Sequence, residues 1–248
     1  MLASFSLFIG AEAMGIFSIF SKMTQQSIDR MNQIKNIPKM HDLMCASNIT
    51  PEELKQFDIC FDHVSFAYCK TPVLRDVSFC VPEGTTTALV GLSGSGKTTV
   101  TNLVARFWDI MKGHGTISIG GKEIKMLSYE NLLKNISFVF QDVFLFNDTV
   151  LNNIRIGRPH ATVEDVQEAA RRAGCAGFIE AMESGYDTVI GEAGSRLSGG
   201  EKQRISIARA IIKDAPIVLL DEVTANVDAE NEQLIQTFIK CAAPPANP

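Results

Sequence analysis

The sequence predicts an α/β domain with a mainly parallel sheet. Short apolar runs such as 217–220 are typical of buried strands, and they alternate along the chain with segments of helical periodicity. An earlier run, Thr85–Val90, leads directly into glycines, and we expect it to be a fully buried strand. Upstream, Phe57–Tyr68 and Val73–Val81 alternate as half-buried strands do, separated by a turn around Lys70–Pro72. The domain is therefore expected to begin with a strand-rich part.

Composition limits the classes of function. The chain has 248 residues, of which 46% are hydrophobic and 21% charged, enough for one sizeable core and an appendage. Its formal net charge is -5, and no run or stripe of Lys and Arg stands out, so we expect no nucleic acid as a partner.

Cysteine usage indicates no chemistry of its own. None of the six cysteines lies in a CxxC or a Cys/His zinc pattern. We expect thiols, buried or on the surface, in a reducing cytosol, rather than a metal site or a disulfide framework. The cysteines are Cys45, Cys60, Cys69, Cys80, Cys175 and Cys241.

The first stretch differs from the rest of the chain. Leu2–Phe20 is apolar, small or hydroxylated apart from Glu12, and about 20 such residues can cross a bilayer as a helix. Basic residues follow it, which by the positive-inside rule puts its C-terminal side in the cytoplasm. A buried core helix is the alternative. Met23–Leu54 is polar with a helical period, broken at Pro38, and is interpreted as a helix and linker.

A glycine-rich segment after Val90 fits the phosphate-loop pattern GxxxxGK[ST] at every position of Gly91–Thr98. Its glycines let several backbone N–H groups point at one anion, and the expected helix Thr98–Phe107 directs its positive dipole end there. Lys97 can reach the phosphates, and the Thr98 hydroxyl can bind Mg²⁺. The predicted nucleotide-binding residues here are Gly91, Ser93, Gly94, Ser95, Gly96, Lys97, Thr98 and Thr99.

Two acids end the apolar run 217–220. Ligands of open α/β sheets bind at the carboxyl ends of strands, so Asp221 and Glu222 are expected beside the phosphate loop. Asp221 suits the Mg²⁺ shell, because a hard cation prefers oxygen ligands. Glu222 can polarise the water that attacks the γ-phosphorus.

A third motif, Leu197–Arg204, reads LSGGEKQR and precedes a helix whose apolar positions include Ile205, Ala208, Ile211 and Ile212. As a second helix N-terminus rich in Ser and Gly, it predicts a second anion site. With this motif, the chain over roughly Phe57–Lys240 resembles the ATP-binding-cassette (ABC) superfamily, whose signature is LSGGQ or LSGGE. The resemblance implies a P-loop NTPase cassette with an antiparallel β subdomain and a helical subdomain.

The resemblance also implies roles for single residues. Two cassettes of this family pair head to tail, so Ser198, Gly199 and Gly200 are expected to contact the ATP of a partner. Tyr68 matches the aromatic that stacks on adenine, unless it is a plain strand tyrosine. Gln141, after the expected strand Ile136–Phe140, matches a glutamine that contacts Mg²⁺ and the attacking water. Asp228 matches an aspartate at the dimer seam.

Other positions resemble exporters within the superfamily. Phe144, Leu145 and Phe146 look like an apolar ledge for a transmembrane coupling helix, or they are plain core. Glu192 matches an acidic position that exporters use near the same interface. The stretch Asp221–Asn231 looks more like the sequence of siderophore- and multidrug-type half exporters than like the commoner family pattern ATSALD. It carries an unusual Val223.

The family also uses a histidine after one further strand, and here all four histidines precede Asp221. We therefore expect a chain cut at both ends, with ATP and Mg²⁺ binding retained and hydrolysis slow or absent. The expected organisation is the end of the last transmembrane helix at 1–22, a helical linker at 23–55, the cassette at 56–241 with its helical subdomain at about 147–196, and an irregular tail at 242–248.

The sequence thus predicts the ATP-binding and ATP-hydrolysing domain of an exporter, an ATPase with ATP and Mg²⁺ as cofactors. Expected partners are a second cassette, identical or not, and a transmembrane domain at the cytoplasmic face of the cell membrane. Two alternatives stay open: a soluble cassette of DNA repair or translation, and an ATP-binding module that is regulatory or deficient in hydrolysis. The apolar first stretch argues against a soluble cassette. The missing histidine favours a module that binds ATP without hydrolysing it.

Overall fold

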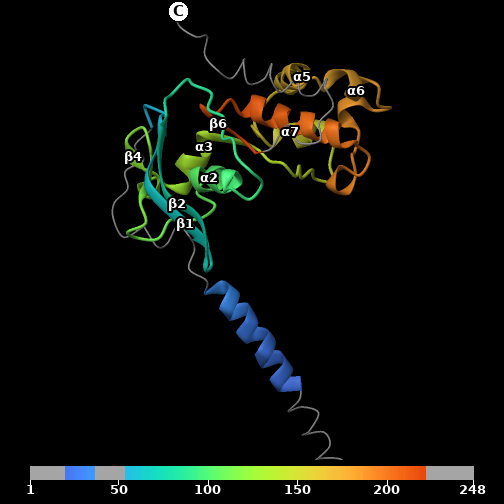
Figure 1. Ribbon diagram of the computed structural model, residues 1–248. Helices are drawn as coiled ribbons and strands as arrows, with labels where there is room; N and C mark the ends of the chain where they lie inside the picture. Colours follow the sequence, from blue (N-terminus) through green and yellow to red (C-terminus); the bar gives the residue numbers. More distant parts are fainter. Residues whose placement is uncertain (1–19, 37–53, 222–248) are drawn as a thin grey trace, which may run out of the picture. The chain divides into compact units, whose positions relative to one another are not determined.

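The structure is a computed structural model that describes residues 20–36 and 54–221 (Figure 1). The chain divides into two units, Met1–Asn48 and Ile49–Pro248. In the first unit, residues 20–35 form an α-helix whose apolar side chains Met31 and Ile34 are exposed. The predicted membrane segment lies outside the described residues except for its last position. Within the described part of the chain, no helix is long and apolar enough to span a bilayer.

The strand-rich part of the second unit is a four-stranded antiparallel sheet in the order β2-β1-β3-β4. The two strands predicted from alternation are confirmed as a hairpin, with its turn at residues 69–70. Pro72 lies inside β2, where it faces Ala67. The strands are β1 (Ile59–Tyr68), β2 (Thr71–Val81), β3 (Thr116–Ile119) and β4 (Lys122–Glu123).

A second sheet pairs two parallel strands, β5 (Ile136–Val139) and β6 (Ile217–Leu220). Side chains of a strand alternate between its two faces, and β6 uses both. Ile217 and Leu219 belong to the core beneath the antiparallel sheet. Val218 and Leu220 pack against a second core formed mostly by helices. The parallel pair therefore lies between the two hydrophobic cores of the domain.

The helices divide between these two cores. The first core contains α2 (Lys97–Val104), with the 3₁₀ turn η1 (Ile124–Met126) and α3 (Tyr129–Lys134) beside it. The second is built around α7 (Gly199–Lys213), which Figure 1 draws beside α5 and α6. Its predicted apolar positions 205, 208, 211 and 212 are all buried. The remaining elements of this half are α4 (Val150–Arg155), α5 (Val163–Arg172), α6 (Ala176–Glu180), η2 (Gly185–Asp187) and η3 (Glu192–Gly194).

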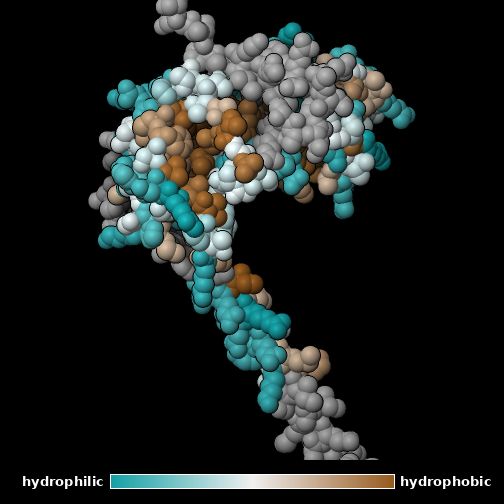
Figure 2. All heavy atoms as spheres, in the orientation of Figure 1, coloured by the Kyte–Doolittle hydropathy of each residue, from teal (hydrophilic) through white to brown (hydrophobic). Residues whose placement is uncertain are grey.

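The prediction of a fully buried strand at Thr85–Val90 is wrong. The segment forms no strand, and its residues are exposed, with Val90 at 95% and the nearby Leu92 at 85%. Figure 2 shows hydrophobic side chains gathered in the region where Figure 1 draws the connection from β2 to α2. A strand is stable only when a neighbour pairs with its backbone. No strand of the described ranges pairs with this segment, so its apolar pattern alone does not order it.

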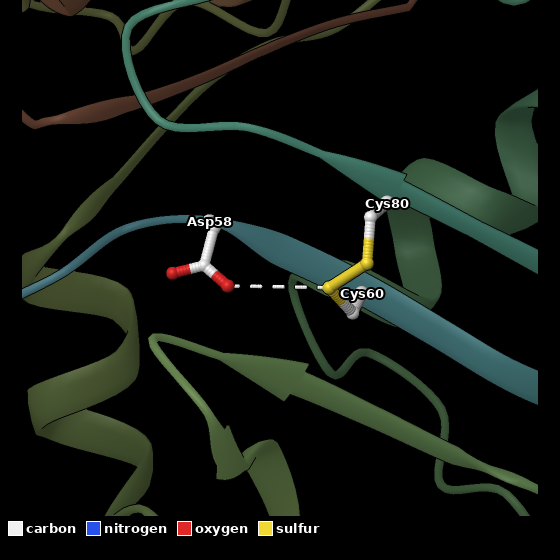
Figure 3. The surroundings of a disulfide bond; sticks show 3 residues. All are labelled: Asp58, Cys60 and Cys80. Carbon is white, nitrogen blue, oxygen red and sulfur yellow. Dashed lines mark hydrogen bonds between the residues drawn. A yellow bond between two sulfur atoms is a disulfide. The ribbon is translucent and has the colours of Figure 1, made fainter.

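The expectation that the cysteines remain thiols is wrong for Cys60 and Cys80 and holds for Cys69 and Cys175, while Cys45 and Cys241 lie outside the described residues. Cys60 of β1 and Cys80 of β2 form a disulfide (Figure 3). Cys69 is a free, exposed thiol, and Cys175 is a free, buried one. Burial raises the pKa of the Cys175 thiol to about 12. The pairing depends on the register of two strands, which no spacing motif in the sequence reveals.

Candidate nucleotide-binding site

The phosphate loop is an exposed turn that ends in a left-handed glycine. Gly96 is the N-cap of α2 with φ of 94°, and Gly94 also has a positive φ of 78°. A Cβ atom on Gly96 would lie 2.8 Å from Cδ2 of Leu74 in β2. A Cβ on Gly91 would lie 2.7 Å from Oγ of Ser95. A side chain at Gly94 or Gly96 would strain the left-handed backbone, whereas at Gly91 it would displace only the rotatable hydroxyl of Ser95.

The ammonium group of Lys97 lies over this loop. Its Nζ donates hydrogen bonds of 3.1 Å to the backbone oxygens of Gly91 and Leu92. The residues from Gly91 to Ser95 are exposed, whereas Gly96 is buried. A positive charge therefore stands beside an exposed backbone turn at a helix N-terminus, an arrangement that attracts an anion.

Thr98, the second residue of α2, contacts the first predicted acid. Its Oγ1 donates a 2.8 Å hydrogen bond to Oδ1 of Asp221, which is only 8% exposed and directly follows β6. The two residues are 123 positions apart in the sequence. The fold thus brings the phosphate loop and Asp221 together.

The parallel pair places a third side chain near this edge. The backbone N–H of Asp221 donates to the oxygen of Val139 at 3.1 Å, so β5 and β6 end side by side. Gln141 follows two residues after β5 and is exposed. Glu222 and Asp228 lie outside the described residues. Of the predicted metal ligands, the structure brings Thr98 and Asp221 into direct contact.

Tyr68 ends β1 and packs in an aromatic cluster. Its ring makes edge contacts with Phe66 at 4.9 Å and with Trp108 at 5.1 Å between centroids. Its strand pairs with β2, whose Leu74 touches the phosphate loop at Gly96. Sequence reasoning missed Trp108, the single tryptophan of the chain, which follows α2 and is about half exposed.

The signature motif forms a helix cap. Ser198 is the N-cap of α7, and its Oγ accepts a 3.3 Å hydrogen bond from the backbone N–H of Glu201. The Glu201 carboxylate accepts bonds of 2.8 Å from the Ser198 backbone N–H and hydroxyl. Ser198 and Gly199 are exposed and Gly200 is half-buried. The motif therefore has a structural reason for its serine and its acid, because this capping box orders the start of α7.

The predicted ledge divides into exposed and buried residues. Phe144 and Phe146 are 63% and 53% exposed and contact each other edge to face, whereas Leu145 is wholly buried. The buried amide of Asn153 holds this loop: its Oδ1 accepts from the N–H of Phe146, and its Nδ2 donates to the Phe146 oxygen. The two phenylalanines thus form an exposed apolar patch, and Leu145 belongs to the core. Glu192 lies exposed in η3.

A comparison with known protein families shows to which family the chain belongs. The model of the family described as ABC transporter matches residues 74–225, more than half of the chain. The chain belongs to the ABC transporter family. The predicted resemblance and cassette fold are confirmed, and the α/β domain described here is an ABC cassette, a member of a family of ATPases.

Among curated proteins, the cassette is 45% identical over 202 residues to a candidate multidrug export ATP-binding/permease protein of Staphylococcus aureus (strain NCTC 8325 / PS 47). That match covers 81% of this chain and 35% of the relative. An ATP-dependent lipid A-core flippase of Syntrophus aciditrophicus (strain SB) is 49% identical over 178 residues, which cover 72% of this chain and 29% of the flippase.

The fold is also similar to the solved structure of a bacterial Atm1-family ABC exporter with ATP bound. The TM-score is 0.79 at 37% sequence identity, over 89% of this chain and 38% of the exporter chain. The chain thus spans about a third of the length of the proteins it matches. These relatives confirm the prediction of an ATP-binding domain of exporter type.

Proposed function

We propose that this cassette binds Mg²⁺–ATP between its phosphate loop and Asp221 and supplies the ATP hydrolysis of an exporter. The observation that carries the proposal is the hydrogen bond between Thr98 and Asp221. It brings together a helix N-terminus that suits a phosphate and a buried carboxylate that suits a hard cation. The ammonium of the half-buried Lys97 adds the positive charge that β- and γ-phosphates need.

The residues fit a magnesium ion by their chemistry. Thr98 and Asp221 are in direct contact, and each offers an oxygen atom as a metal ligand. Gln141 offers an amide oxygen from the loop after the neighbouring strand. Magnesium prefers such oxygen ligands, and when bound it would neutralise charge on the phosphates. In this proposal the ring of Tyr68 stacks on the base, Glu222 polarises the attacking water, and Thr99 and the loop residues from Gly91 to Gly96 hold the phosphates.

The proposal extends to two partners. The motif Ser198–Gly200 would contact ATP held by a second cassette, with Asp228 at the seam. The exposed pair Phe144 and Phe146 would receive a transmembrane domain, at the cytoplasmic face of a membrane. Support comes from the named relatives, which are described as a multidrug export ATP-binding/permease protein, a lipid A-core flippase and an ABC exporter. The first two relatives are described with different cargo, so no transported molecule is assigned to this chain.

The test measures equilibrium binding of ATP in the presence of Mg²⁺, by calorimetry, to the wild-type chain and to two variants. Lys97→Ala should weaken binding by about 10- to 100-fold, because charge-assisted hydrogen bonds contribute about 1.5–3 kcal/mol. Lys112→Ala, outside the loop, should leave the affinity within about twofold. Unchanged affinity in Lys97→Ala would refute the proposed site.

The second cassette is tested by sedimentation. Wild-type protein with Mg²⁺ and ATP should form a dimer that is absent without nucleotide. Ser198→Arg should prevent that dimer and retain ATP binding, since its own phosphate loop is intact. If the variant dimerises as readily as wild type, the signature motif does not face the partner's nucleotide.

A further inference from the structure

The disulfide between Cys60 and Cys80 joins the two strands of the β1–β2 hairpin (Figure 3). The two residues are direct partners in the antiparallel register, and their Cα atoms are 4.2 Å apart. They are 20 positions apart in the sequence. The sulfur atoms meet at the open end of the hairpin, since the turn lies at the other end.

The neighbouring pairs hold this register without help from the sulfur atoms. Ile59 faces Val81 on one side of the cysteines, and Phe61 faces Phe79 on the other. The rings of Phe61 and Phe79 are stacked with centroids 4.6 Å apart. Cross-strand pairs of this kind stabilise a sheet, so the two cysteine side chains stay opposite each other when the bond is reduced.

The two sulfur positions differ in access and in charge. Cys80 is exposed, whereas Cys60 is half-buried. Oδ2 of Asp58 lies 3.9 Å from Sγ of Cys60 (Figure 3). Cys60 therefore lies partly covered and beside a carboxylate, whereas the side chain of Cys80 is open to solvent. Cys80 is therefore the residue that a small molecule in solution reaches and that attacks it.

We propose that Cys60 and Cys80 form a reversible thiol–disulfide site that exchanges with small-molecule disulfides of the glutathione type. The reversibility rests on the proposed function, which places the cassette at the cytoplasmic face of a membrane. Thiols there are kept reduced by glutathione, and disulfides in that compartment are usually transient or redox-sensing rather than permanent staples.

The exchange proceeds in two balanced steps. The Cys80 thiolate attacks one sulfur of glutathione disulfide, forms a mixed disulfide with it and expels one glutathione thiolate. The Cys60 thiolate then attacks Sγ of Cys80 and expels the second glutathione thiolate. In sum, two protein thiols are oxidised to one disulfide, one glutathione disulfide is reduced to two glutathione molecules, and the protons pass from the protein thiols to glutathione.

Oxidation would act on the segment that leads to the phosphate loop. β2 ends at Val81, one residue after Cys80, and the following residues up to Ser95 are exposed. The bond fixes the start of that segment, while Gly96 packed on Leu74 fixes its end. Closing a loop of this length restricts opening of the hairpin, so amide hydrogen exchange at residues 79–81 should slow by about tenfold or more in the oxidised protein.

The test titrates the full chain with mixtures of oxidised and reduced glutathione, blocks free thiols, and maps tryptic peptides by mass. Trypsin leaves Cys80 in residues 76–97, and it leaves Cys60 together with Cys69 in residues 56–70. In excess glutathione disulfide these two peptides should be linked, with the loss of two hydrogens. In excess reduced glutathione they should separate, and both cysteines should carry the blocking group.

Two variants identify the sulfur atoms. Cys69→Ser removes the exposed thiol that shares the peptide with Cys60, and the linked pair should persist; Cys60→Ser should abolish it. Loss of the link in Cys69→Ser, absence of a link at any glutathione ratio, or a link that excess reduced glutathione leaves intact would each overturn the proposal. Lys97→Ala should form the link normally, so a failure of nucleotide binding is distinguishable from a failure of the redox site.

Discussion

The guanidinium of Arg209 in α7 binds Asn153 of α4 through two atoms. Its Nε donates to the Asn153 backbone oxygen and its Nη2 to the Asn153 side-chain oxygen, each at 2.7 Å. Its Nη1 donates to the backbone oxygen of Phe144, also at 2.7 Å. Partial burial lowers the pKa of Arg209 to about 10, so the group is charged at neutral pH. One side chain thus ties the signature helix to the loop that presents Phe144 and Phe146.

We predict that Arg209→Met lowers the free energy of unfolding by about 2–4 kcal/mol, measured by urea denaturation. Methionine retains the aliphatic stem, but three acceptors in a partly buried setting each lose one hydrogen bond, although Oδ1 of Asn153 keeps the N–H of Phe146 as a donor. The matched control is Arg171→Met, since Arg171 pairs with Glu168 on the exposed surface of α5. That change should cost no more than about 0.5 kcal/mol. Equal losses in the two variants would show that the Arg209 network adds no special stability.

Elements set by a local pattern could be predicted from the sequence, whereas those that need a distant partner could not. The strand at 217–220 and the buried face of α7 follow from periodicity, because each pattern reports which side of one element meets the core. The phosphate loop follows from its glycines. Burial of Thr85–Val90 depends on a pairing partner, which no pattern within the segment can supply.

Two features outside the nucleotide site depend on contacts between distant segments. The Cys60–Cys80 pair depends on strand register, and the β1–β2 ladder has three shifts that counting along the chain cannot place. Arg209 lies in a helix that also carries Arg204 and two lysines, so the sequence alone does not distinguish it from an ordinary solvated charge. Its role depends on the backbone oxygens of Phe144 and Asn153, which the fold brings to it.

The Thr98–Asp221 contact leads to a prediction about magnesium. Thr98→Val keeps the shape of the side chain and removes the hydroxyl that binds Asp221. ATP affinity with Mg²⁺ should fall by about tenfold, while affinity in the presence of a chelator should stay within about twofold, because only the metal-dependent part uses the hydroxyl. Calorimetry under both conditions measures the difference. Thr98→Ser, which retains the hydroxyl, serves as the control, and an equal loss with and without metal would contradict the prediction.

The two left-handed glycines of the phosphate loop should differ in their tolerance of a methyl group. Gly96→Ala combines a φ of 94° with a contact of 2.8 Å to Cδ2 of Leu74, so it should lower the free energy of unfolding by about 2–3 kcal/mol. Gly94→Ala has a φ of 78° but open space around the new atom, and backbone strain alone costs about 1–2 kcal/mol. Thermal and urea unfolding of both variants tests the order. A Gly94 variant less stable than the Gly96 variant would rule out the steric argument.

The pH dependence of the β1–β2 hairpin should report on His63. Its Nδ1 lies 2.6 Å from Oδ1 of Asp76, and this hydrogen bond, with the charges of Asp76 and Asp62, raises the pKa of His63 above its ordinary value of 6.5. Because the folded state binds the proton more tightly, the stabilisation is fully present below pH 6.5 and is lost as the pH rises through the raised pKa. Urea denaturation across that range should show stability falling with pH in wild type and a flatter profile in His63→Gln.

The two acids beside His63 should contribute unequally, which NMR titration of its ring can measure. Asp76 is hydrogen-bonded to the ring, whereas the nearest oxygen of Asp62 is 3.9 Å from Nε2. Asp76→Asn should therefore return the pKa of His63 most of the way to 6.5, and Asp62→Asn should lower it less. Both pairs are exposed to water, so added salt should weaken the effect of each acid. A larger shift in Asp62→Asn than in Asp76→Asn would mean that the short contact does not set the protonation of this histidine.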